Sequence, residues 1–144
     1  MKKNYLFFTF ITILVFLGCG QNSENQAQEN KSSKSKLLVY YFHSTHRCPT
    51  CNSIEENTKA TLEKYFAKEL KDGIIIFKTF NVDDKANEKI AKKYDAFGSA
   101  LFFTTYNQGK EQNEDLTNFA FKYSRNKPEY FIDELKKKIE EKVK

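Results

Sequence analysis

The motif Cys48-Pro49-Thr50-Cys51 constrains the fold more than any other feature, because of the segments on either side of it. A dense apolar run, Leu37 to Phe42, precedes the motif, and a stretch with helical spacing of apolar residues follows it. Such a run is typical of a strand buried on both faces, and Pro49 favours the first turn of a helix. Two cysteines at this spacing can bridge, and a helix N-terminus stabilises a thiolate. The sequence therefore predicts a switchable disulfide between a strand and a helix.

The spacing after the motif predicts one helix over about residues 49–71, ended by Asp72-Gly73. Cys51 falls in the middle of its apolar face, which also carries Ile54, Leu62, Tyr65, Phe66 and Leu70. Cys48 lies about 60° away around the helix and at its very start. We therefore expect Cys51 to be buried and Cys48 to reach solvent.

Further strands are predicted at Ile74 to Phe80 and at Leu101 to Tyr106, where β-branched and aromatic residues are dense. The first of these should run parallel to the strand before the motif, because a helix connects the two. The turn Asn107-Gln108-Gly109-Lys110 favours a hairpin, which would require an edge strand at Glu111 to Leu116. The sequence thus predicts a mixed sheet.

Two more helices complete the pattern. Asp83 or Asp84 can cap a short one whose inner positions would be Ala86, Ile90 and Tyr94. Asn126 and Glu129 can cap a C-terminal helix across Pro128, and its apolar positions recur every four residues at Phe131, Leu135, Ile139 and Val143. We expect this last helix to pack its apolar stripe on the sheet.

This order of elements resembles the thioredoxin-like superfamily over about residues 37–143. Within it, Tyr40-Tyr41-Phe42-His43, Arg47-Cys48-Pro49-Thr50-Cys51 and Ile54-Glu55-Glu56-Asn57 resemble the ArsF-like branch. The resemblance implies an α/β fold, a thioredoxin-like three-layer sandwich with a mixed central sheet and flanking helices. It also implies thiol-disulfide exchange at the two cysteines.

The sequence departs from the thioredoxin pattern at two positions. Ala100 stands where family members carry a cis-proline before the third strand, and Phe42 stands where they carry a buried carboxylate. A cis bond to a non-proline residue costs about 2.5–4 kcal/mol, so we expect a trans peptide at Ala100. Without the carboxylate, His43 and His46 are the remaining candidate bases for Cys51.

The predicted catalytic residues are Cys48 as the attacking thiol, Cys51 as the resolving thiol, and His46 and Arg47. Arg47 and the helix N-terminus should lower the pKa of Cys48, while His46 could stabilise the thiolate or pass protons. Attack on a partner disulfide would give a mixed disulfide through Cys48, which Cys51 then resolves. His43 should instead make a fixed hydrogen bond within its loop. We expect no cofactor, and we expect Phe97 to be exposed beside the site.

Three alternatives remain open for the cysteine pair. Cys48 and Cys51, with His46 or His43, could bind and deliver a thiophilic ion such as Cu(I), Zn(II) or arsenite. The pair could also be an inert structural disulfide, or the chain could be a scaffold in a larger membrane-bound assembly.

The first third of the chain predicts export. Residues 1–19 have the basic start, short apolar run and terminal Gly18-Cys19 of a signal peptide. Phe16-Leu17-Gly18-Cys19 resembles the bacterial lipobox, which implies acylation of Cys19, with a plain signal peptide as the alternative. Residues 20–36 are almost entirely polar and predict a flexible tether, followed by a domain at 37–144. We expect a lipid-anchored protein facing the periplasm or the cell exterior.

The charge balance limits the classes of partner. The whole chain has a formal net charge of +5, and loss of Lys2 and Lys3 with the signal would leave about +3. No basic cluster with interleaved aromatic residues is present, so we expect no nucleic-acid partner. The predicted partners are exported proteins with cysteines or a membrane redox donor, besides the membrane itself, and we expect a monomer.

Overall fold

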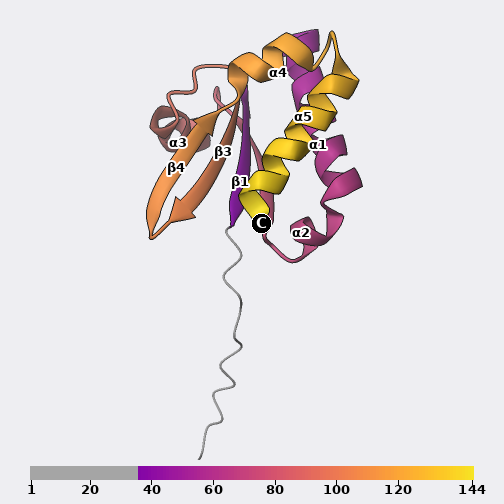
Figure 1. Cartoon of the computed structure of the whole chain (residues 1–144). Coiled ribbons are helices and arrows are strands. Elements are labelled where there is room, and N and C mark those ends of the chain that lie inside the picture. The colour runs from indigo at the N-terminus through magenta and orange to yellow at the C-terminus, as the bar shows by residue number, and fades with distance from the viewer. Residues whose placement is uncertain (1–35) are drawn as a thin grey trace, which may run out of the picture. The chain divides into compact units, whose positions relative to one another are not determined.

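The computed structural model describes residues 36–144 of the 144-residue chain (Figure 1). The predicted signal peptide at 1–19 and the lipid attachment at Cys19 lie outside these residues. So does the predicted tether at 20–36, except for Lys36, which is exposed.

The described residues form a four-stranded mixed sheet with the strand order β2-β1-β3-β4. β1 (Leu37–His43) is central and pairs in parallel with β2 (Ile75–Asn81), as predicted for strands joined through a helix. It pairs antiparallel with β3 (Ala100–Asn107) on its other side. β3 continues into β4 (Lys110–Asp115) as a hairpin, which confirms the predicted edge strand.

The hairpin turn needs positive backbone φ angles at both central residues. Gln108 has φ 50° and Gly109 has φ 76°. These values belong to the two-residue turn whose twist matches paired strands, and glycine adopts such a φ without a steric cost. The predicted turn is therefore confirmed, and it fixes the register of the weakly apolar β4.

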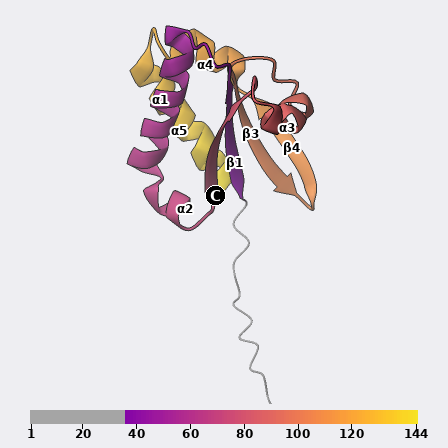
Figure 2. The same cartoon turned by 180° about the vertical axis from the view of Figure 1, so that it is seen from behind.

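Helices cover both faces of the sheet (Figures 1 and 2). α1 (Pro49–Tyr65) and α5 (Pro128–Val143) lie on one face, and η1 (Lys85–Asn87) with α3 (Glu88–Lys93) lies on the other. The strand order and these layers are those of the thioredoxin-like α/β sandwich, so the predicted fold class is confirmed.

Two hydrophobic clusters hold the layers together. β1 contributes to both, because alternate residues of a strand point to opposite faces. Val39 and Tyr41 belong to the larger cluster, which includes the predicted positions Phe131, Leu135 and Ile139 of α5. Phe42 belongs to the smaller one, with Tyr94, Ala96, Ala100 and Phe102. The apolar run before the cysteines is thus buried on both faces, as its composition predicts.

The predicted single helix over 49–71 is wrong in one respect. α1 ends at Tyr65, and a separate α2 (Ala67–Lys71) follows Phe66, whose φ of −132° lies outside the helical range. The break turns the Phe66 side chain into the main core and leaves Tyr65 exposed, although Tyr65 was predicted on the inner face. The apolar spacing runs on through this point, so it carried no signal of the break.

A short helix that the sequence did not predict, α4 (Thr117–Tyr123), separates β4 from α5. It lies at the end of the sheet where α1 begins (Figures 1 and 2). The Leu101 N–H donates to Thr117 Oγ1 at 3.1 Å, and Asn57 Nδ2 donates to the Ser124 carbonyl at 2.7 Å. α4 therefore connects the start of β3 to the side of α1, and these tertiary bonds offset its short length.

The predicted cap of α5 is wrong, whereas the predicted cap by Asp84 is confirmed. Lys127, with no side-chain capping bond, stands at the N-cap of α5, so the predicted cap by Asn126 and Glu129 is wrong. The Lys127 N–H instead bonds to the Tyr123 carbonyl at 2.8 Å, so that α4 leads into α5. Asp84 does accept from the Ala86 N–H, but Ala86 itself is exposed.

No helix among residues 36–144 combines the length and the apolar character needed to cross a membrane.

Candidate redox site

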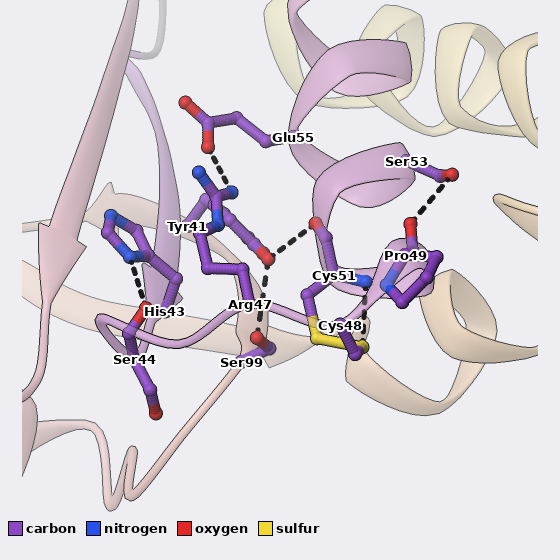
Figure 3. A network of polar contacts seen from close by, with 10 residues as sticks. All are labelled: Tyr41, His43, Ser44, Arg47, Cys48, Pro49, Cys51, Ser53, Glu55 and Ser99. Carbon is purple, nitrogen blue, oxygen red and sulfur yellow. Dashed lines mark hydrogen bonds and ion pairs between the residues drawn. A yellow bond between two sulfur atoms is a disulfide. The ribbon is translucent and has the colours of Figure 1, made fainter.

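Cys48 and Cys51 form a disulfide at the first turn of α1, with Cα atoms 5.0 Å apart (Figure 3). Cys48 is the N-cap residue, and its Sγ accepts a hydrogen bond from the Cys51 N–H at 3.1 Å. Cys48 is exposed, whereas Cys51 is 8% exposed and buried in the helix face. The two sulfurs therefore differ as the helical spacing predicted. An N–H directed at Cys48 Sγ would also stabilise a thiolate there.

The loop between β1 and the cysteines is fixed from the neighbouring strand β2. The Val82 N–H bonds to the His43 carbonyl at 2.8 Å. Thr45 is held twice, since its N–H donates to Asp83 Oδ2 at 2.7 Å and its Oγ1 accepts from Asn81 Nδ2 at 3.0 Å. The segment that delivers Cys48 to the helix is thus tied to the adjacent βα connection.

The hydrogen bond between Thr45 and Asp83 predicts how the stability of the domain changes at acidic pH. The hydrogen bond from the Thr45 backbone lowers the pKa of Asp83 below its usual range. Because the folded pKa lies below the unfolded one, this contact contributes stability above the unfolded pKa and loses it as the pH falls through the folded pKa. We expect Asp83→Asn to lower the urea midpoint at neutral pH, and the difference from wild type to shrink as the pH falls below the usual range of an aspartate pKa. Asp133→Asn, a change at an exposed position of α5, should give no such converging curves.

The two histidines occupy different environments. His43 Nδ1 lies 3.0 Å from the Ser44 carbonyl, and its ring stacks on that of Tyr41 at 6.0 Å, in line with the expected local hydrogen bond. His46 is exposed in the loop. Within the described chain, no hydrogen bond joins either histidine to a sulfur, so a role in proton transfer stays a prediction.

Arg47 points away from the cysteine that follows it. Its guanidinium forms an ion pair with Glu55 of α1, and its Cζ lies 5.5 Å from the centre of the Tyr41 ring (Figure 3). Burial lowers the pKa of Arg47, but the hydrogen bond to Glu55, with a smaller contribution from the nearby Tyr41, outweighs it and raises the pKa above the usual value. In the disulfide form Arg47 therefore pairs with Glu55, and its predicted partnership with the Cys48 thiolate stays a prediction.

Tyr41 joins β1 to the cysteine helix. Its ring is fully buried, and its hydroxyl donates to the Cys51 carbonyl at 2.7 Å. Ser99, from the loop before β3, lies 3.4 Å from the same hydroxyl and can donate to it. The sequence analysis assigned no role to Tyr41, Glu55 or Ser99. The position of Glu55 four residues after Cys51, on the same helix face, was the available signal.

Removal of the Tyr41 hydroxyl should weaken the fold measurably. We expect Tyr41→Phe to lower the free energy of unfolding by about 0.5–1.5 kcal/mol, the usual net value of one hydrogen bond. Tyr130→Phe is the matched control, because Tyr130 is exposed on α5 and makes no hydrogen bond within the described residues. Urea unfolding of both variants would measure the difference, and equal midpoints would show that the Tyr41 hydroxyl is not structural.

The two departures from the thioredoxin pattern lie opposite each other in the sheet, because Phe42 of β1 pairs with Ala100 of β3. Phe42 is fully buried in the aromatic cluster under α3, and Ala100 is buried at the start of β3. Residues 36–144 contain no cis peptide bond, so the peptide before Ala100 is trans as expected. Phe97, three residues earlier, is 82% exposed, which confirms its predicted exposure, while its place beside the site stays a prediction.

The described residues contain no group of three or more His, Cys, Asp or Glu side chains placed to hold a metal ion. Cys48, Cys51 and His46, the ligand set of the metal-binding alternative, do not form such a group in the disulfide form.

Comparison with known proteins gives only weak likenesses. No protein-family profile and no curated protein sequence matches the chain. Among solved structures it is similar to a thioredoxin from Thermus thermophilus, with 22% identity, a TM-score of 0.46, and coverage of 71% of this chain and 72% of that one. A Fasciola hepatica thioredoxin has 27% identity, a TM-score of 0.38, and coverage of 58% and 70%. The Drosophila melanogaster germline-specific thioredoxin Deadhead has 23% identity and a TM-score of 0.38, with coverage of 63% of this chain and 84% of that one. The thioredoxin-like fold therefore rests on the sheet order and helix layers described above.

Proposed function

We propose that this protein is an exported, membrane-tethered thiol-disulfide oxidoreductase that acts through Cys48 and Cys51. The observation that carries the proposal is the disulfide at the first turn of α1, with an exposed outer sulfur that accepts a backbone N–H and a buried inner one. A purely structural disulfide gains little from this position, because so short a loop constrains the unfolded chain only slightly.

The exchange proceeds in two steps that conserve atoms and electrons. The Cys48 thiolate attacks one sulfur of a partner disulfide, forms a mixed disulfide, and displaces the other partner sulfur as a thiolate. Cys51 then loses its proton and attacks Cys48 Sγ, which closes the Cys48–Cys51 bond and releases the second partner thiolate. Two electrons pass from the cysteine pair to the partner, and the reverse sequence oxidises a partner dithiol.

The wider setting is part of the proposal. The lipobox resemblance at residues 16–19 supports lipid attachment through Cys19, and the polar residues 20–36 support a flexible tether. We place the protein on a bacterial membrane, facing the periplasm or the exterior. Its partners would be exported proteins with cysteines or a membrane redox donor.

The test is exchange by the full-length protein in detergent with a glutathione redox buffer. We expect the Cys48–Cys51 bond to open and close reversibly as the ratio of glutathione to glutathione disulfide changes, as followed by thiol alkylation and mass spectrometry. We also expect catalysis of disulfide reduction in a model protein. A bond that stays closed across the whole range, with no catalysis, would leave an inert structural disulfide.

A further inference from the structure

The Arg47–Glu55 ion pair lies across the start of the cysteine helix. Arg47 directly precedes Cys48, while Glu55 follows Cys51 by four residues and therefore lies one turn later on the same face of α1. Each of the two side chains is 25% exposed. Solvent therefore screens this pair less than it screens the ion pairs on the outer face of the helix, such as Lys59–Glu63.

The buried ring of Tyr41 fixes the position of the Arg47 guanidinium. The cation lies 5.5 Å from the ring centre, while the Tyr41 hydroxyl is bonded to the Cys51 carbonyl. Arg47 donates to Glu55 through Nη2, whereas its buried Nε has no hydrogen-bond partner in the described structure. Glu55 and Tyr41 therefore decide where this charge lies, and Figure 3 shows it directed toward Glu55 and away from the sulfurs.

We infer that Glu55 is a positioning residue that withholds Arg47 from the Cys48 thiolate and thereby sets the reduction potential of the disulfide. The inference rests on the proposed function. Reduction by two glutathione molecules breaks the Cys48–Cys51 bond and forms glutathione disulfide. Cys48 is left as a thiolate, with its proton released to solvent, and Cys51 as a thiol. The Cys48 thiolate is then a second anion beside Arg47, which directly precedes it in the chain. It competes with Glu55 for the Arg47 guanidinium.

The competition has a definite direction. A cation close to a thiolate stabilises the reduced form and makes the disulfide a stronger oxidant. As long as Glu55 keeps Arg47, the Cys48 thiolate depends mainly on the helix N–H groups. Glu55 therefore holds the protein toward the reducing end of its range.

Few other charges face this part of the site. Arg47, Asn52, Glu55, Glu56 and Lys59 line a shallow depression on the side of α1. Lys59 pairs with Glu63 at 3.8 Å, and Asp83, on the other side of the loop, is engaged by the Thr45 N–H. His46 is exposed. Glu56 makes no ion pair within residues 36–144, so Glu56→Gln is a matched control for removing one carboxylate from the same turn.

The experiment measures the glutathione equilibrium constant at fixed pH for the full-length wild type, Glu55→Gln, Glu56→Gln, Arg47→Gln and the double variant Arg47→Gln/Glu55→Gln. We expect Glu55→Gln to favour the reduced form by about three- to tenfold, the range for one partly screened charge near the thiolate. That corresponds to a potential about 15–30 mV more positive. Alkylation of Cys48 at the same pH should show a larger thiolate fraction.

The double variant distinguishes two effects of Glu55: holding Arg47 away from the Cys48 thiolate, and direct electrostatic repulsion between the Glu55 carboxylate and that thiolate. We expect Glu55→Gln to change the equilibrium clearly less in the Arg47→Gln background than in wild type, because no guanidinium is left to release. Equal changes in the two backgrounds, or an equal change from Glu56→Gln, would overturn the inference. Failure of the wild type to equilibrate with glutathione would instead refute the proposed function. Unchanged far-ultraviolet circular dichroism would establish that the variants are folded.

Discussion

Replacement of Cys48 by serine is expected to abolish thiol-disulfide exchange, leaving only the rate of the uncatalysed reaction in solution. Cys48 has the exposed sulfur, and the attacking group in every exchange is a thiolate that can reach the partner. A serine hydroxyl ionises far too weakly at neutral pH to replace it. The buried Cys51 cannot take over, because its sulfur lies within the helix face.

Cys51→Ser should give a different result, and the contrast is the stronger evidence. This variant keeps the attacking thiol but lacks the resolving one, so it should accumulate a mixed disulfide with its partner. Mass spectrometry or non-reducing electrophoresis would detect that adduct. Exchange by Cys48→Ser at the wild-type rate, or adducts of Cys48→Ser through Cys51, would contradict the assigned order of attack.

The second large effect is expected at Phe42. Phe42→Asp would introduce the carboxylate that the thioredoxin pattern has at this position. We expect it to destabilise the domain by more than about 4 kcal/mol. The Phe42 ring is fully buried and lies 5.3 Å from Phe80, 5.4 Å from Tyr94 and 5.9 Å from Phe102. The substitution would empty this space and place an unpaired carboxylate among aromatic rings. With a typical total of about 5–15 kcal/mol, much of the stability would be lost.

The pH dependence of this variant identifies the cause. Burial raises the pKa of a carboxyl group, so the folded variant would bind a proton that the unfolded chain releases. A raised folded pKa makes the variant less stable as the pH rises above the unfolded value, so the deficit should be larger at neutral pH than in mild acid. Urea unfolding at both pH values would measure it. Phe97→Asp, at an 82% exposed position, should change stability by no more than about 0.5 kcal/mol.

A stable Phe42→Asp variant would have a specific meaning. The smaller aromatic cluster would then tolerate a carboxylate as the thioredoxin pattern does, and proton transfer to Cys51 could be restored by this one residue. A gain in the rate of the resolving step would accompany it. Loss of stability with no such gain is the result expected from the packing around Phe42.

Much of the fold could be predicted because local and tertiary preferences agree. β1 is apolar on both faces and is buried on both, and Pro49 begins α1 where the sequence placed a helix start. The weak strand β4 followed from the turn at Gln108 and Gly109, since a hairpin requires a second strand. The inequivalence of Cys48 and Cys51 followed from helix geometry alone.

The missed features depend on contacts between residues far apart in the chain. α4 is held by bonds from Leu101 and Asn57, which no local pattern reveals. The helix breaks at Phe66, whose ring lies in the main core, although the spacing of apolar residues continues unchanged. At the site, sequence adjacency suggested that Arg47 serves Cys48. In the disulfide form Arg47 pairs with Glu55 and lies beside the Tyr41 ring, while its partnership with the thiolate stays a prediction.

The direction of β1 determines how the protein can be handled. The described chain enters the sheet at Leu37, and the cysteine loop leaves the far end of the same strand after His43. Seven extended residues separate those points by about 20 Å. A bead, an electrode or a fused carrier joined to the N-terminal side would therefore be attached at the end of the sheet remote from the sulfurs. Such an immobilised preparation should leave Cys48 open to macromolecular thiols, which suits it to trapping them from crude extracts.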